Sequence, residues 1–146
     1  VNLVPEFMLT IRRGAVEQLE RRDPSFTDMK KGSECFHIVT LPMQDNIVDF
    51  CREAKRRSEE QTRFINAESD ALIFISCLPW VDITALTNER DFDCEDSVPR
   101  ISWGKYTEEN GRLMLGMSVE VNHRLIDGVH IGQFAAALEA GIDSLE

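Results

Sequence analysis

The chain has 146 residues, 42% hydrophobic and 29% charged, a size and balance that favour one globular domain over residues 1–146. Its 26 acidic and 16 basic residues give a net charge of -10, which repels phosphate backbones and excludes nucleic acid as a general partner. No apolar run is long enough to cross a bilayer and no signal-peptide pattern opens the chain, so the sequence predicts no membrane partner.

The first half of the chain predicts a hairpin, a short strand and one helix. Residues 7–12 alternate apolar and polar side chains, which is the period of a β-strand, and Gly14 predicts the hairpin turn that follows. Residues 35–41 form another short apolar run. Asp45 predicts the N-cap of a helix over residues 46–64, because apolar side chains recur there at helical spacing.

The second half predicts two strands and a helix. Residues 71–80 form an apolar strand that Pro79 ends, and residues 112–123 form a long strand. Residues 131–142 predict a helix with one apolar stripe, made of Ile131, Phe134, Ala135, Leu138 and Ile142. Strands covered by a few amphipathic helices predict an α/β fold built as a two-layer sandwich.

The cysteines indicate the compartment. Cys35, Cys51, Cys77 and Cys94 are widely spaced and form no CxxC pair. This spacing favours free thiols in a reducing compartment and fits neither a disulfide framework nor a zinc site. The sequence therefore predicts a cytoplasmic protein without a metal ion.

A polar triplet around His123 interrupts the apolar pattern between the last strand and the last helix. Val119, Val121 and His123 share one strand face, so the imidazole is expected to be partly desolvated. A histidine held neutral in this way can accept a proton. Asp127 and Gly128 then predict a sharp turn into the helix. The alternative reading is a packed core histidine followed by an ordinary Asp-Gly turn.

The spacing of His123, Asp127 and Gly128 matches the HxxxDG motif of CoA-dependent acyltransferases. Three other stretches, in the same order as in that superfamily, strengthen the match: "SFTDMKKGSECFHIV", "FISCLPWVDI" and the run from "PRISWGKY" to "HIGQF". Together they resemble the chloramphenicol acetyltransferase family along essentially the whole chain. The chain corresponds to the family's C-terminal two-thirds and begins "VNLVPEF" without a methionine, so we expect a piece of a longer polypeptide that lacks the family's N-terminal segment.

This resemblance implies a mixed, mostly antiparallel sheet with helices packed on one face. It also implies transfer of an acetyl group from acetyl-CoA, a co-substrate and not a bound cofactor, to a hydroxyl of chloramphenicol or a related small molecule, as in antibiotic resistance. By resemblance His123 is the general base, Ser76 stabilises the oxyanion and Ser102 holds a transition-state water.

The resemblance assigns further residues to binding and assembly. Lys105 and Tyr106 match a pair beside the CoA tunnel, although an exposed surface pair has the same pattern. Asp127 and Gly128 are structural in the family, where the aspartate pairs with an arginine from the N-terminal segment. The related enzymes are trimers with active sites between subunits, so a homotrimer is expected.

Two other functions remain open from the sequence. A dihydrolipoyl acyltransferase core carries a similar histidine motif, but "LPW" at residues 78–80 favours the chloramphenicol acetyltransferases. A non-catalytic relative that serves binding or assembly would not need Ser76, Ser102 and His123 together. Segment 88–99 is acidic, whereas the drug-modifying relatives have an apolar segment there. The acceptor can therefore be a molecule other than chloramphenicol.

Overall fold

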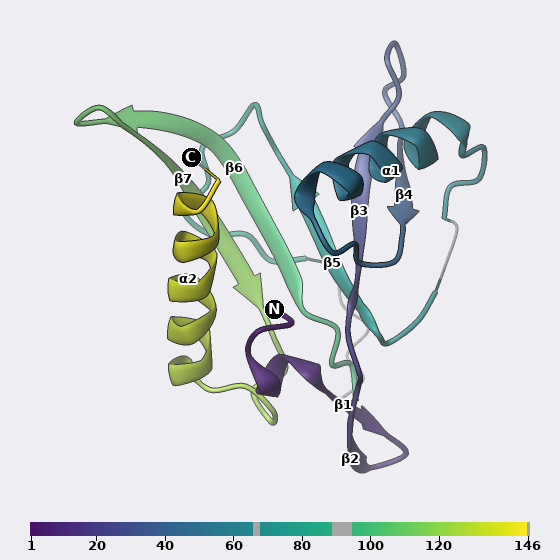
Figure 1. The fold of residues 1–146 in the computed structure, drawn as a ribbon, viewed down its shortest axis with the longest axis vertical. Helices are drawn as coiled ribbons and strands as arrows, with labels where there is room; N and C mark the ends of the chain where they lie inside the picture. The colour runs from purple at the N-terminus through teal and green to yellow at the C-terminus, as the bar shows by residue number, and fades with distance from the viewer. Residues whose placement is uncertain (66–67, 89–94, 146) are drawn as a thin grey trace.

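The structure, a computed structural model, describes residues 1–65, 68–88 and 95–145 (Figure 1). Cys94 and half of the acidic segment 88–99 lie outside these residues. The elements in chain order are the 3-10 helix η1 (Pro5–Met8), β1 (Leu9–Arg12), β2 (Ala15–Gln18), β3 (Asp23–Met29), β4 (Phe36–Thr40), α1 (Ile47–Glu60), β5 (Leu72–Cys77), β6 (Arg100–Glu109), β7 (Arg112–Glu120) and α2 (Gly128–Asp143).

The main sheet has five strands in the order β4-β3-β5-β6-β7, and β1 and β2 form a separate hairpin. β3 runs antiparallel to β4 and parallel to β5, while β6 runs parallel to β5 and antiparallel to β7. The predicted α/β fold with a mixed sheet is confirmed, and two of its four pairings are parallel. The hairpin turn at Gly14, which has a φ of 78°, is also as predicted.

Both helices cover the same face of the sheet (Figure 1). α2 places Phe134 against Ile73 of β5 and Ile101 of β6. α1 reaches the same face through a hydrogen bond from Ser58 to Asp28 of β3. Because alternate strand residues point to opposite faces, the other face of the sheet carries a different set of side chains, and these are mostly polar along the central strands.

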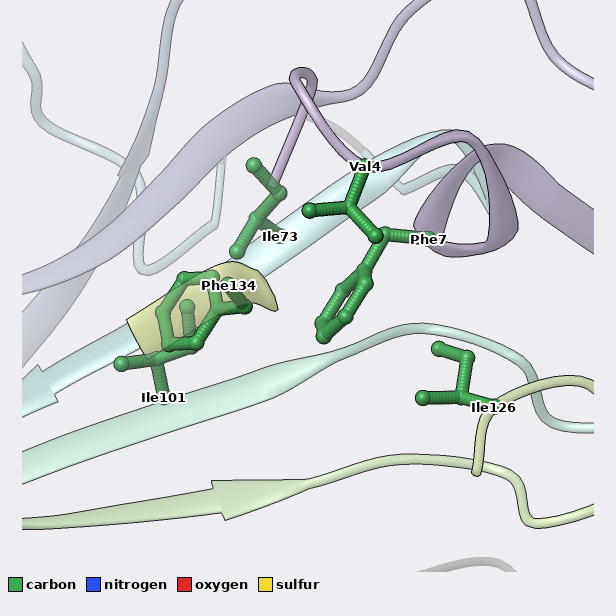
Figure 2. Packing of buried hydrophobic residues seen from close by; sticks show 6 residues of the cluster. All are labelled: Val4, Phe7, Ile73, Ile101, Ile126 and Phe134. Carbon is green, nitrogen blue, oxygen red and sulfur yellow. The ribbon is translucent and has the colours of Figure 1, made fainter. Parts of the chain in front are cut away.

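The core lies between α2, the sheet and the N-terminal segment, as Figure 2 shows. The rings of Phe7 and Phe134 stack with centroids 5.5 Å apart. This contact joins η1 to the last helix, two elements from opposite ends of the chain. The cluster consists of Val4, Phe7, Ile73, Ile101, Ile126 and Phe134.

A buried arginine, Arg22, ties the β1-β2 hairpin to the main sheet. Its side chain is fully buried and donates hydrogen bonds to backbone carbonyls. Removal from water lowers the pKa of Arg22 to about 10, although the charge of Asp70 opposes this shift. The guanidinium therefore replaces its lost hydration with main-chain oxygens, which belong to Phe7, Leu9, Asp70, Leu72 and Ser97.

Several boundaries differ from the sequence predictions. The N-cap of α1 is Asn46 and not Asp45, because the Asn46 side chain accepts a hydrogen bond of 2.9 Å from the Asp49 backbone N–H. The last strand ends at Glu120, before His123. β3 and β6 were not predicted as strands. Among the described residues, neither helix has the length and apolarity that a membrane crossing requires.

Candidate functional site

Three serines lie in one row across the face of the sheet that the helices leave open. The strand register places Ser76 of β5 opposite Ser102 of β6, and Ser102 opposite Ser118 of β7. Ser102 is only 1% exposed. Thr27 of β3 donates a hydrogen bond of 3.4 Å from its Oγ1 to the Oγ of Ser76. The open face thus concentrates hydroxyl groups where the central strands meet.

A cavity of about 370 Å³, here called the serine cavity, lies over this row. Its wall combines hydroxyl groups, aromatic rings, one amide and one guanidinium. The residues that line it are Ser25, Phe26, Thr27, Phe36, Ile38, Phe74, Ile75, Ser76, Asn88, Arg100 and Ser102. A wall of this mixed kind suits a small molecule with an apolar body and a few polar groups.

A second cavity, of about 500 Å³ and here called the Trp80 cavity, begins at the end of β5. Ser76 lines both cavities, so molecules that occupy them can meet at its hydroxyl. The second wall consists of Thr27, Asp28, Met29, Glu34, Phe36, Ser76, Cys77, Pro79 and Trp80.

The segment after β5 crosses the open face of β6 and β7, and its Asn88 lines the serine cavity. It fits there because Gly104 and Gly116 have no side chain, and a Cβ on either would overlap a backbone oxygen of residues 81–83. Ser118 Oγ donates to the Leu86 carbonyl at 2.8 Å. The carboxylate of Glu120 accepts hydrogen bonds from the backbone N–H and the side chain of Asn88.

His123 does not continue the apolar strand face, so the predicted desolvation is wrong for this chain. β7 ends at Glu120, and a turn then carries His123 outward, where its side chain is 83% exposed. The Nδ1 atom lies 3.2 Å from the Ile126 carbonyl oxygen and 3.1 Å from Asp127 Oδ1. Since both partners only accept, Nδ1 carries the proton and Nε2 is left as the basic nitrogen.

The structure brings Ser76 and Ser102 together but places His123 elsewhere. From the row of Ser76, Ser102 and Ser118, β7 runs towards the amino-terminal ends of β5 and β6 before it ends. His123 follows beyond that end, whereas Ser76 lies next to the carboxyl end of β5. His123 is not among the described residues that line either cavity.

The other predicted residues lie outside both cavities. Lys105 and Tyr106 are exposed on β6, next to a register irregularity between Trp103 and Tyr106. Asp127 is the N-cap residue of α2, and its backbone N–H donates to His130 Nδ1 at 2.9 Å. Gly128 begins the helix. In the described ranges, no group of three or more His, Cys, Asp or Glu side chains could hold a metal ion.

Sequence reasoning missed Arg100 and Asn88, the two nitrogen-bearing side chains of the serine cavity. Arg100 stands two residues before Ser102, and the alternation of a strand would have placed both on one face. Asn88 carries no comparable signal, because its position depends on the contact with Glu120, 32 residues later.

Comparison with known proteins supports one family. A family profile described as chloramphenicol acetyltransferase matches residues 1–139. The chloramphenicol acetyltransferase of Bacillus pumilus is 26% identical over 143 residues, which cover 94% of this chain and 65% of that protein. Chloramphenicol acetyltransferase 3 of Escherichia coli is 28% identical over 145 residues, which cover 95% of this chain and 68% of that protein. The chain thus spans about two thirds of the length of these relatives.

Solved structures show the same fold. A chloramphenicol acetyltransferase superposes with a TM-score of 0.80 at 22% identity, over 91% of this chain and 67% of the other. A dihydrolipoamide acetyltransferase of Azotobacter vinelandii gives a TM-score of 0.69 at 18% identity, over 94% of this chain and 60% of the other. With a family profile that covers nearly its whole length, this chain belongs to the chloramphenicol acetyltransferase family.

Proposed function

We propose that the protein is an O-acetyltransferase that moves an acetyl group from acetyl-CoA to a hydroxyl of a small molecule, with residues 1–146 forming one domain of the enzyme. The position of Ser76 carries this proposal, because its hydroxyl lies between two cavities and opposite Ser102. One cavity can hold the acceptor and the other the thioester end of acetyl-CoA. The names of the relatives point to the same chemistry.

His123 acts as the general base in this proposal. An alcohol attacks a thioester only if a base removes its proton during the attack, and a positioned base contributes roughly 10²- to 10⁴-fold to the rate. Nδ1 donates to the Ile126 carbonyl, so Nε2 presents a lone pair to the acceptor. Asp127, 3.1 Å from Nδ1, orients the ring and stabilises the imidazolium that forms.

Ser76 donates a hydrogen bond to the oxyanion of the tetrahedral intermediate. A hydroxyl has one proton to donate, and Thr27 supplies the donor in its contact with Ser76. The Ser76 proton is therefore free to point at the developing charge. Ser102, nearly fully buried in the same cavity, holds a water next to the reacting carbon. Lys105 and Tyr106 bind the CoA moiety where the exposed second half of β6 begins.

The separation of His123 from Ser76 favours a homotrimer in which each active site takes one residue from each of two subunits. β7 is an edge strand of the main sheet, and its Leu113, Leu115 and Met117 are exposed. Exposed apolar edges invite pairing with another chain. A second subunit that lies along this edge and extends past Glu120 would bury the turn of His123 against the open face of its neighbour.

The test is release of CoA from acetyl-CoA by the purified full-length protein. The acceptor panel contains chloramphenicol, other primary and secondary alcohols, and dihydrolipoamide. Acetylation of an alcohol, seen as a mass increase of one acetyl group, supports the proposal. Acetylation of dihydrolipoamide alone would replace it with a lipoyl-dependent acyltransferase, and absence of transfer to every acceptor would reject enzymatic activity.

A further inference from the structure

Arg100 is the one charged side chain among the described residues that line the serine cavity. It stands on β6 two positions before Ser102, so both side chains point to the open face of the sheet. Its side chain is only 12% exposed. A cation that is largely removed from water, at the wall of a cavity beside Ser76, influences which molecules can bind there.

Contacts on two sides hold the guanidinium in place. One terminal nitrogen donates to Asp96 Oδ2 at 2.8 Å, and the other donates to the Val98 carbonyl at 3.1 Å. The group also lies over the ring of Phe74, with its central carbon 5.5 Å from the ring centroid. Because these contacts fix the guanidinium before any ligand binds, little ordering cost remains for the binding step.

Arg100 has more hydrogen-bond capacity than these contacts use. A guanidinium carries five N–H donors, and among the described residues only Asp96 and Val98 accept from it. The Asp96 contact runs through a single nitrogen and is not the two-point contact that arginine and a carboxylate can form. Among the described residues no Arg100 nitrogen is both fully buried and without a partner, so the unused N–H groups stay accessible, and a ligand in the cavity that supplies acceptor oxygens can meet them.

We propose that Arg100 selects a hydroxyl acceptor that also carries a carboxylate. The flat fork of the guanidinium fits the two oxygens of a carboxylate, whereas the rings of Phe36 and Phe74 contact the apolar body of the acceptor. Two carboxylates stand close to Arg100, that of Asp96 at 2.8 Å and that of Glu120, its partner in the β6-β7 register, so the carboxylate of the acceptor must bind through the N–H groups that Asp96 leaves unused. The inference rests on the proposed acetyl transfer and names its acceptor class.

The structural alternative is that Arg100 only anchors Asp96 and the chain before β6. Replacement of Arg100 would then destabilise the protein without changing its preference among acceptors. The two roles differ in one measurable quantity, the ratio of kcat/KM for a hydroxy acid to kcat/KM for its neutral amide. A purely structural role leaves this ratio unchanged, and a selective role makes it depend on the charge at position 100.

The experiment uses the full-length protein, acetyl-CoA, and tropic, mandelic and 3-hydroxybutyric acids, each beside its amide. For at least one pair we expect the wild type to prefer the acid by roughly tenfold or more, as a charge-assisted hydrogen bond predicts. Arg100→Gln, which keeps donors but loses the charge, should bring the ratio close to one. Arg100→Lys should restore part of the preference. The matched control, the exposed Arg52→Gln on α1 outside both cavities, should keep the wild-type ratio.

Equal use of acid and amide by the wild type, in all three pairs, would overturn the inference and leave acetyl transfer intact. So would a preference that survives Arg100→Gln. Calorimetric titration of the acids without acetyl-CoA separates the two proposals. If no alcohol is acetylated but an acid binds and Arg100→Gln abolishes this binding, the carboxylate site stands and the proposed enzymatic function fails.

Discussion

Ser76 of β5 lies directly opposite Ser102 of β6, and both hydroxyls belong to the wall of one cavity. The two strands are parallel neighbours, although the two serines stand 26 positions apart in the sequence. Parallel pairing therefore joins the two polar groups that the proposed mechanism needs at the acetyl carbon. The proposed base is not brought close by this pairing. His123 follows the end of β7 that lies beside the amino-terminal end of β6, away from Ser76.

Replacement of Ser76 by alanine should lower kcat by roughly 10²- to 10³-fold with little change in either KM, because the lost donor contacts only the transition state. Steady-state kinetics with acetyl-CoA and the best acceptor measure this. Thr27→Val removes the hydrogen bond to Ser76 and should have a smaller effect. If Ser76→Ala changes only a KM, Ser76 binds a ground state and the assignment is wrong.

Replacement of His123 by alanine should lower kcat by at least roughly 100-fold, while the thermal unfolding midpoint stays close to wild type, because the side chain is exposed and makes few contacts. The exposed Arg52 of α1 provides the control, and Arg52→Ala should retain activity. Near-normal turnover of a folded His123→Ala protein would remove His123 from the mechanism.

The sequence predicted elements whose pattern is local. The apolar run of β5 and the stripe of α2 are visible in their own residues, and Phe134 of that stripe is buried as expected. β3 was missed because "DPSFTDM" contains a proline and shows no clear alternation, so only its position between β4 and β5 makes it a strand. Local propensity does not encode such pairing.

The sequence predicted the placement of some candidate site residues correctly and of others wrongly, whereas their catalytic roles stay predictions. Ser76 and Ser102 were identified from motifs, and the strand register then brought them together. The exposure of His123 was mispredicted because the alternation was extended past Glu120, where a turn closed by hydrogen bonds from Leu125 and Ile126 to the Asn122 carbonyl replaces the strand. Arg100 was missed because its role depends on the cavity.

The close approach of the chain to Gly116 predicts how a substitution there changes the free energy of unfolding. Gly116→Ala should lower the free energy of unfolding by about 1–3 kcal/mol, because the new methyl group overlaps the Ile83 carbonyl oxygen. Gly132 in α2 has open space around it, so Gly132→Ala should raise the free energy of unfolding by about 0.5–1 kcal/mol. Denaturant titration measures both. Equal stability of Gly116→Ala and wild type would mean that the segment after β5 does not pack on β7 as described.

The lowered pKa of Asp70 predicts how the free energy of unfolding changes with pH in acid. The hydrogen bond from Arg12 holds the pKa of Asp70 below its ordinary value of 3.8. A lowered folded-state pKa contributes stability that is present above the ordinary value and is lost as the pH falls through the folded-state value. Asp70→Asn should therefore be less stable than wild type at pH 7, and the two should converge in acid. A difference that stays constant with pH would contradict this, and Arg12→Leu should produce the same pattern as Asp70→Asn.

The last prediction concerns a site shared between subunits. His123→Ala and Ser76→Ala should each be inactive alone, because each lacks one of the two groups that act on the same acetyl transfer. In mixed trimers some interfaces combine an intact serine from one subunit with an intact histidine from another. Denaturing the two variants together and refolding them should therefore restore part of the wild-type activity.

The control is a mixture of the two variants without denaturation, which should stay inactive for as long as subunits do not exchange. Mass spectrometry of the intact assembly, with one variant isotopically labelled, shows whether mixed oligomers have formed. Restored activity that rises with the fraction of mixed oligomers supports a shared site. If mixed oligomers form and the activity stays at the level of the single variants, His123 and Ser76 act within one chain, and the turn after β7 must then move towards the serine cavity during the reaction.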